Sequence, residues 1–246
     1  MSQRLSKKIF NICIIIVIIV AIIFVALMMI LNYAENGETN MPFNLSKITI
    51  ISTVDGKDVG DETNRWNLQV NQNNDIYIYI AKNENYKKTQ TIKSVTINNF
   101  NIKVAPGEGN ITIYKPSVNE VSIFKNLDEN IAQEIVINGD TSTDIQNLKI
   151  SNQGGIVAFR CANNNLGTYI SNDDEEINYK NLLGKMNINE ESLRTKITFD
   201  MAIELNSGTK FKAESIEVEI PIDDITKEGT TSLEITNLDS IIFKRI

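Results

Sequence analysis

The stretch that decides the fold is residues 197–222, ITFDMAIELNSGTKFKAESIEVEIPI. Apolar residues take every second position on either side of the sequence NSGT at 206–209. Because successive side chains of a β-strand point to opposite faces of a sheet, this alternation predicts two strands, each buried on one face. The turn-forming residues between them predict a hairpin. Pro221 falls on the outward phase, which favours a strand near a sheet edge, since proline cannot donate a hydrogen bond to a neighbouring strand.

The same alternation continues through most of the chain after residue 46. At Asn98-Asn99 it shifts by one residue, which predicts a β-bulge or a tight bend. Many short strands at this spacing are typical of an antiparallel sandwich or barrel. We therefore expect an all-β fold, an antiparallel β-sandwich over residues 47–246 with one short helical insertion. Further strands are predicted around residues 48–50, 68–70, 76–80, 95–104, 111–114, 121–124, 135–137, 148–150 and 156–159.

The helical insertion is predicted within residues 171–195, SNDDEEINYKNLLGKMNINEESLRT. Ser171 and Asp174 have the spacing of a capping box. The apolar residues that follow recur at helical spacing, which predicts a helix over 173–186 and a helical turn over 190–194. Such a segment either covers the core of the sandwich or binds a partner.

An internal duplication is suggested by a second repeat of the hairpin pattern. Residues 76–97 resemble residues 197–218 at a constant offset of 121. The corresponding halves would be residues 47–126 and 147–246. Because identities between them are few, a real duplication and two unrelated hairpins of equal length both fit the sequence.

The N-terminal part contains an apolar run, residues 9–31, IFNICIIIVIIVAIIFVALMMIL. As a helix these 23 residues measure about 34 Å, enough to cross a hydrocarbon core of about 30 Å. Signal peptides have shorter apolar regions, which end in small residues at the cleavage site. This run is longer, and it does not end in small residues. We therefore predict an uncleaved anchor at 9–31, a tail at 1–8 and a polar juxtamembrane linker at 32–46.

Charge predicts the orientation of that anchor. Residues 1–31 carry +3 and no acidic residue. Lysine and arginine are retained on the cytoplasmic side, so we expect a cytoplasmic N-terminus and an extracytoplasmic domain at the cell membrane. Since the whole chain carries −7, residues 32–246 carry −10. This acidic domain lacks the basic surface that nucleic acids bind, so nucleic acid is not an expected partner.

Several kinds of chemistry are excluded by composition. The chain has no histidine, which removes Ser-His-Asp and Cys-His catalysis and histidine-ligated metal sites. The motifs of sortases and of type I signal peptidases, two families with an N-terminal anchor and an exported β domain, are also missing. Cys161 is the single cysteine after the anchor, so the domain has no disulfide of its own. That absence favours a bacterial envelope protein over a secreted eukaryotic one.

Four remaining features could bind a ligand, but we predict no catalytic, cofactor-binding or metal-binding residue. Cys161 is expected to be a buried core residue. The acidic stretch 55–62 is expected to be a solvated loop, with weak calcium binding as the alternative. Gly154-Gly155 is expected to form a hairpin turn. The aromatic residues Trp66, Tyr77, Tyr79 and Tyr86 are expected to pack in the core, with a sugar-binding platform as the alternative.

These observations predict a non-enzymatic, membrane-anchored protein that binds or scaffolds other envelope components. The expected partner is another envelope protein or a polymer, recruited at a sheet edge by strand addition. The alternative is a carbohydrate-binding or adhesin-like surface module. An enzyme that uses carboxylates alone is a third hypothesis, although no pair of acidic residues points to it.

Overall fold

The computed structural model describes residues 2–61, 63–104, 110–117, 122–139 and 150–246. The chain forms two units, Met1–Thr39 and Asn40–Ile246. The first contains α1, Ser2–Asn36, whose described side chains from Phe10 to Leu31 are all exposed. Within the described part of the chain, the apolar stretch of this helix is the one candidate for crossing a membrane. By length and composition it is sufficient to do so.

The predicted linker 32–46 is shorter in the structure. The helix continues to Asn36, whose amide donates to the side chain of Asn32 at 2.8 Å, one turn earlier. Gly37 then ends it with a φ of 67°, and its N–H donates to the carbonyl of Tyr33. The first strand begins at Phe43, which is 1% exposed, so the end of the predicted linker belongs to the core.

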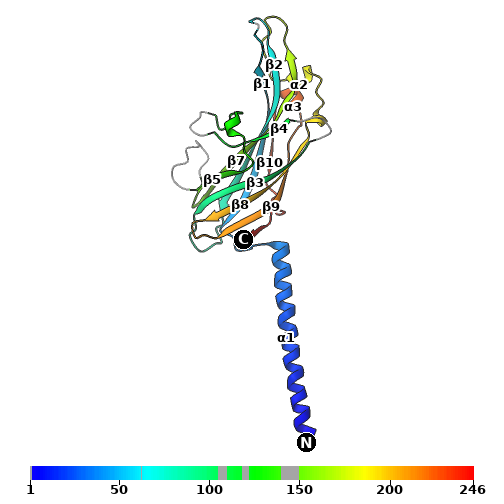
Figure 1. The fold of residues 1–246 in the computed structure, drawn as a ribbon, viewed down its shortest axis with the longest axis vertical. Helices are drawn as coiled ribbons and strands as arrows, with labels where there is room; N and C mark the ends of the chain where they lie inside the picture. Colours follow the sequence, from blue (N-terminus) through cyan, green and yellow to red (C-terminus); the bar gives the residue numbers. More distant parts are fainter. Residues whose placement is uncertain (1, 62, 105–109, 118–121, 140–149) are drawn as a thin grey trace. The chain divides into compact units, whose positions relative to one another are not determined.

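The second unit is an antiparallel β-sandwich, which confirms the predicted fold class (Figure 1). One sheet has the order β10-β1-β2-β7-β4, with β6 also paired to β7, and the other has the order β11-β9-β8-β3-β5. The strands are β1 Phe43–Asp58, β2 Asn67–Lys82, β3 Ile92–Val104, β4 Asn110–Tyr114, β5 Ile135–Asn138, β6 Ile150–Ser151, β7 Gly154–Ile170, β8 Thr195–Leu205, β9 Lys210–Glu219, β10 Thr230–Ile235 and β11 Phe243–Arg245.

The main core lies between the two sheets and consists of the apolar residues that alternate along their strands. At its centre Phe159 of β7 meets Phe199 of β8 edge to face, with ring centroids 5.2 Å apart. Phe100 of β3 packs on Phe159 at 5.1 Å. Because β7 and β8 belong to different sheets, this aromatic cluster joins the two layers.

The hairpin of residues 197–222 forms as predicted. Strands β8 and β9 pair with Ile197 opposite Val218, and Gly208 in the turn has a φ of 84°. The bulge predicted at Asn98-Asn99 is also confirmed, since the β3–β8 register shifts between Asn98 and Asn101. Pro221 lies beyond the end of β9 rather than within a strand, because it has no N–H to donate.

The helix predicted over 173–186 is wrong. Only Leu182–Lys185 (α2) is α-helical in this segment. Asp174 and Asn181 have φ values of 55° and 58°, and residues in the left-handed region end a right-handed helix. Ser171 does not cap a helix; its hydroxyl accepts a hydrogen bond from the backbone N–H of Trp66 at 2.9 Å.

The helical turn predicted over 190–194 is confirmed as a 3₁₀ helix, Glu190–Leu193, capped by the side chain of Asn189. Its residue Leu193 joins Leu182 of α2 and Ile225 of α3, Ile225–Glu228, in a second apolar cluster with Val54, Leu68 and Val70. The helical segments therefore cover an end of the core, which is the first of the two roles considered for them.

The suggested duplication is not supported by the strand pairing. Residues 76–97 do not form a hairpin, because β2 lies in one sheet and β3 in the other. The strand predicted at 121–124 is also absent from its described residues 122–124. Residues 148 and 149 of another predicted strand lie outside the described residues.

The two glycines at 154 and 155 begin β7 instead of forming the hairpin turn, which is made by Asn152-Gln153. Gly154 has a φ of 99°, and a Cβ atom there would lie 2.1 Å from the carbonyl oxygen of Ile80. A glycine is required at this position because the backbones of β7 and β2 approach so closely.

Candidate functional site

The sandwich opens sideways between β3 of one sheet and β4 of the other. Strand β5 pairs with β3 only from Ser94 to Ile97. In the described part of the chain, β3 after Ile97 has no strand partner on this side. Strand β4 pairs with β7 on one edge, while its other edge makes an isolated bridge between Tyr114 and Ile131. Two incompletely paired strand edges therefore face the same opening.

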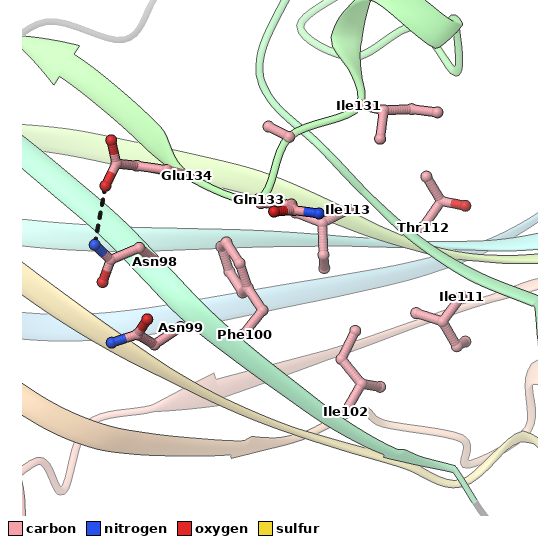
Figure 2. A pocket seen from close by; sticks show the side chains of 11 residues that line it. Asn98, Asn99, Phe100, Ile102, Ile111, Thr112, Ile113, Ile131, Gln133 and Glu134 are labelled. Atoms are coloured by element: carbon pink, nitrogen blue, oxygen red, sulfur yellow. Dashed lines mark hydrogen bonds between the residues drawn. The ribbon is translucent and has the colours of Figure 1, made fainter.

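A groove of about 720 Å³ occupies this opening (Figure 2). Its apolar floor consists of Phe100 and Ile102 from β3 together with Ile111 and Ile113 from β4. Ile131, which is 48% exposed, adds an apolar side chain at the rim. This lining matches the usual composition of a binding groove, in which apolar contacts dominate and a few polar groups fix orientation.

Polar groups line the end of the groove nearest the β3 bulge. The amide of Asn98 donates to the carboxylate of Glu134 at 3.0 Å (Figure 2). Asn99 has a φ of 55°, and its side-chain amide donates to the carboxylate of Asp200 on β8 at 2.7 Å. The bulge thus points two neighbouring asparagine side chains in different directions and fixes both.

Asp200 holds the bulge in place. Burial by itself would raise the pKa of this carboxyl, but hydrogen bonds from Lys212, the Ser215 N–H and Asn99 lower it below its usual value. The carboxylate is therefore the favoured form, and it accepts the Ser215 N–H at 2.9 Å and the Lys212 ammonium at 2.8 Å. This network gives the end of the groove a defined geometry.

The groove can supply apolar contacts, amide and carboxylate hydrogen bonds, and, within the described residues, the strand edge of β3 after Ile97. On β4 the carbonyl of Ile113 already accepts the Ala132 N–H, so this edge is open only in part. Comparison with protein-family models, with curated proteins and with solved structures finds no match for this chain.

Cys161 is a core residue, as predicted. It is completely buried, and burial raises the pKa of its thiol to about 12. The acidic stretch 55–62 differs from the predicted loop, because Asp55 and Asp58 lie on β1. The Asp58 carboxylate accepts hydrogen bonds from the N–H groups of Gly60 and Asn67. Among the described residues, which exclude Glu62, acidic and cysteine side chains form no cluster suited to a metal ion.

The four aromatic residues do not form one platform. The expectation that they pack in the core is wrong for Trp66, Tyr79 and Tyr86, whereas Tyr77 packs against a small buried cluster of Phe124 and Ala158. Tyr77 and Tyr79 lie half-buried on the outer face of β2, because their positions alternate with the buried isoleucines. Trp66 is 44% exposed, and its indole N–H donates to the carbonyl of Glu175 at 3.1 Å. Tyr86 lies at the end of a turn, where its backbone N–H donates to the carbonyl of Asn83.

Trp66 belongs to a rigid corner built around Glu175. Hydrogen bonds from Lys185, the Asn172 N–H and Tyr169 lower the pKa of the Glu175 carboxyl to about 2. The Lys185 ammonium lies 2.6 Å from this carboxylate. Glu175 lies within the segment for which a helix was predicted, and its contacts instead fasten that irregular segment to the end of β7.

Proposed function

We propose that this chain is a single-pass membrane protein of the bacterial cell envelope that binds an extended segment of another envelope protein. In this function its N-terminus is cytoplasmic and its β-sandwich extracytoplasmic. The protein acts as a non-enzymatic binding or scaffolding component. The observation that carries the proposal is the groove, in which an apolar floor lies between the edges of β3 and β4.

Strand addition is the binding mode that this geometry favours. An incoming strand gains main-chain hydrogen bonds from an unpaired edge, and its alternate side chains enter the apolar floor. Because the floor is lined by Phe100, Ile102, Ile111 and Ile113, the partner segment should carry apolar residues at every second position. Pairing would also cover edges that otherwise expose backbone donors and acceptors.

A photo-crosslinking residue in place of Gln133, at the exposed rim of the groove, should capture this partner in cells. Adding Ile102→Lys should reduce the captured amount about tenfold, because a charge on the floor excludes apolar side chains. The measurement is the yield of the cross-linked band from the full-length chain, with its partner identified by mass spectrometry.

The matched control is Val136→Lys, which places the same charge on β5 at a residue that is 51% exposed and does not line the groove. Capture with this control should match that of the parent chain. Equal capture by the Ile102→Lys chain, with an unchanged melting temperature, would show that the partner does not use the groove.

The orientation predicts a specific pattern of protease protection. In cells stripped of their wall, added protease should digest the β-sandwich, while a reporter fused before Met1 should stay intact. The reason is the +3 charge that precedes the apolar run and the absence of acidic residues there. Immunoblotting of both ends measures the result. A mature chain that begins near Glu35 and accumulates in the medium would contradict the anchored topology.

A further inference from the structure

A second cavity lies on the outer face of the sheet that contains β1, β2, β7 and β4. Its volume is about 590 Å³, and its lining comes from those four strands and from residues 124–127. It shares no lining residue with the groove between β3 and β4. We refer to it as the polar cleft, because asparagine and glutamine provide nearly half of its lining. These amide residues are Gln69, Asn71, Asn110, Asn126, Asn164 and Asn165.

The base of the polar cleft is rigid. Arg160 donates from Nε and Nη2 to the two oxygens of Asp75, at 2.5 and 2.9 Å. Its remaining nitrogen Nη1 donates to Asn126 at 3.0 Å, and the Asn126 amide donates in turn to Asn73 at 2.8 Å. The side chains of Arg160 and Asp75 are only 14% and 15% exposed. This network fixes the cleft before any ligand arrives, which reduces the entropic cost of binding.

Several amide groups in the cleft keep hydrogen-bonding capacity. Asn71 uses its oxygen to accept the Asn165 N–H at 2.8 Å, which leaves its NH₂ group. The NH₂ group of Asn164 donates to the Thr112 hydroxyl at 3.0 Å, which leaves the Asn164 side-chain oxygen able to accept a hydrogen bond from a ligand. The Gln69 side chain has no hydrogen bond to another described residue and offers both groups. Donors and acceptors are therefore presented side by side.

The cleft carries charges of both signs and offers little open apolar surface. The Arg160 charge is neutralised by Asp75, the lining also contains the acidic Asp55 beside the basic Lys57 and Lys125, and the acidic charge of the domain repels polyanions. Tyr114 and Phe124 are 6% and 3% exposed, so their rings offer little open surface. Within the lining, Leu127 is the exposed apolar side chain, at 46%. A ligand that matches the amide-rich part of this lining carries many groups that both donate and accept hydrogen bonds, and the mixed charges around it favour no single sign of ligand charge.

From these observations we infer that the polar cleft binds a neutral oligosaccharide. Hydroxyl groups are both donors and acceptors, and neighbouring hydroxyls of a sugar match the paired groups of a side-chain amide. This site is separate from the groove proposed for a protein segment, so each can fail without the other. It also differs from the aromatic platform that the sequence suggested, since Trp66, Tyr77, Tyr79 and Tyr86 do not line it.

The test uses the full-length protein in phosphatidylcholine nanodiscs, because many detergents carry sugar head groups. The probes are an array of uncharged glucans, mannans, galactans and N-acetylhexosamine oligomers, with polygalacturonic acid oligomers as the anionic arm. We expect saturable binding of at least one neutral oligomer. Gln69→Met and Asn164→Leu should each weaken it about tenfold, since each removes a hydrogen-bonding amide at little change in volume.

The control is Asn101→Leu, which removes an exposed amide on β3, outside the cleft. It should leave binding unchanged. Gln69→Met breaks no hydrogen bond within the described protein, so its effect would not come from misfolding, and melting temperatures check this directly. The inference is overturned by the absence of binding to every neutral oligomer, by binding of the anionic oligomers alone, or by affinities that neither cleft variant changes.

Discussion

Phe199→Ala is expected to lower the free energy of unfolding of the β-sandwich by about 4 kcal/mol. Phe199 is completely buried, and its ring packs edge to face on Phe159 at 5.2 Å and lies 6.3 Å from Phe100. The contact with Phe159 crosses from one sheet to the other, so truncation leaves a cavity where the layers meet. The cost therefore combines lost transfer energy, a cavity and lost aromatic contacts.

Denaturant unfolding of the full-length chain in nanodiscs measures this change. The fluorescence of Trp66, the single tryptophan, reports on the sandwich. The matched control is Val136→Ala, since Val136 is 51% exposed on β5 and should change the stability by less than about 0.5 kcal/mol. A loss below about 1 kcal/mol for Phe199→Ala would mean that the two sheets do not depend on this cluster.

Local sequence pattern was sufficient for most of the strands and for their inward faces, although not for the strand predicted at 121–124. The alternation around Phe199 and the phase shift at Asn98-Asn99 each concern neighbouring residues, whose geometry follows from the two-residue period of a strand. The burial of Cys161 was equally predictable, because it is a small residue within an apolar strand. These predictions required no knowledge of which strands pair.

The failed predictions depend on contacts between residues far apart in sequence. The helical pattern after Ser171 was overridden because Glu175 bonds to Tyr169 and Lys185, and because Asp174 and Asn181 are left-handed. The groove was not predictable, since it requires the order of strands in both sheets. The polar cleft was missed for the same reason: its amides come from three strands and a loop, and each alone resembles an ordinary exposed polar residue.

The ion pair beneath the polar cleft gives the second large expected effect. Asp75→Asn should lower the free energy of unfolding by about 3 kcal/mol, because it leaves the Arg160 guanidinium without its carboxylate at a site that is mostly shielded from water. Replacing both residues, as Asp75→Leu with Arg160→Met, removes the charge together with its partner. The double variant should therefore recover most of the loss, and denaturant unfolding of the double-mutant cycle measures the difference.

The Lys47–Glu234 pair is the control, because its side chains are 34% and 50% exposed and their attraction is screened by water. Glu234→Gln should change the stability by less than about 1 kcal/mol. If Asp75→Asn lowers the free energy of unfolding no more than Glu234→Gln does, the buried Arg160–Asp75 pair contributes no more to stability than the exposed Lys47–Glu234 pair.

The double variant also separates stability from binding. A folded chain without the Asp75–Arg160–Asn126 network keeps the sandwich but loses the fixed base of the cleft. Weakened oligosaccharide binding by that chain, at nearly restored stability, would show that the network serves the site and not only the fold.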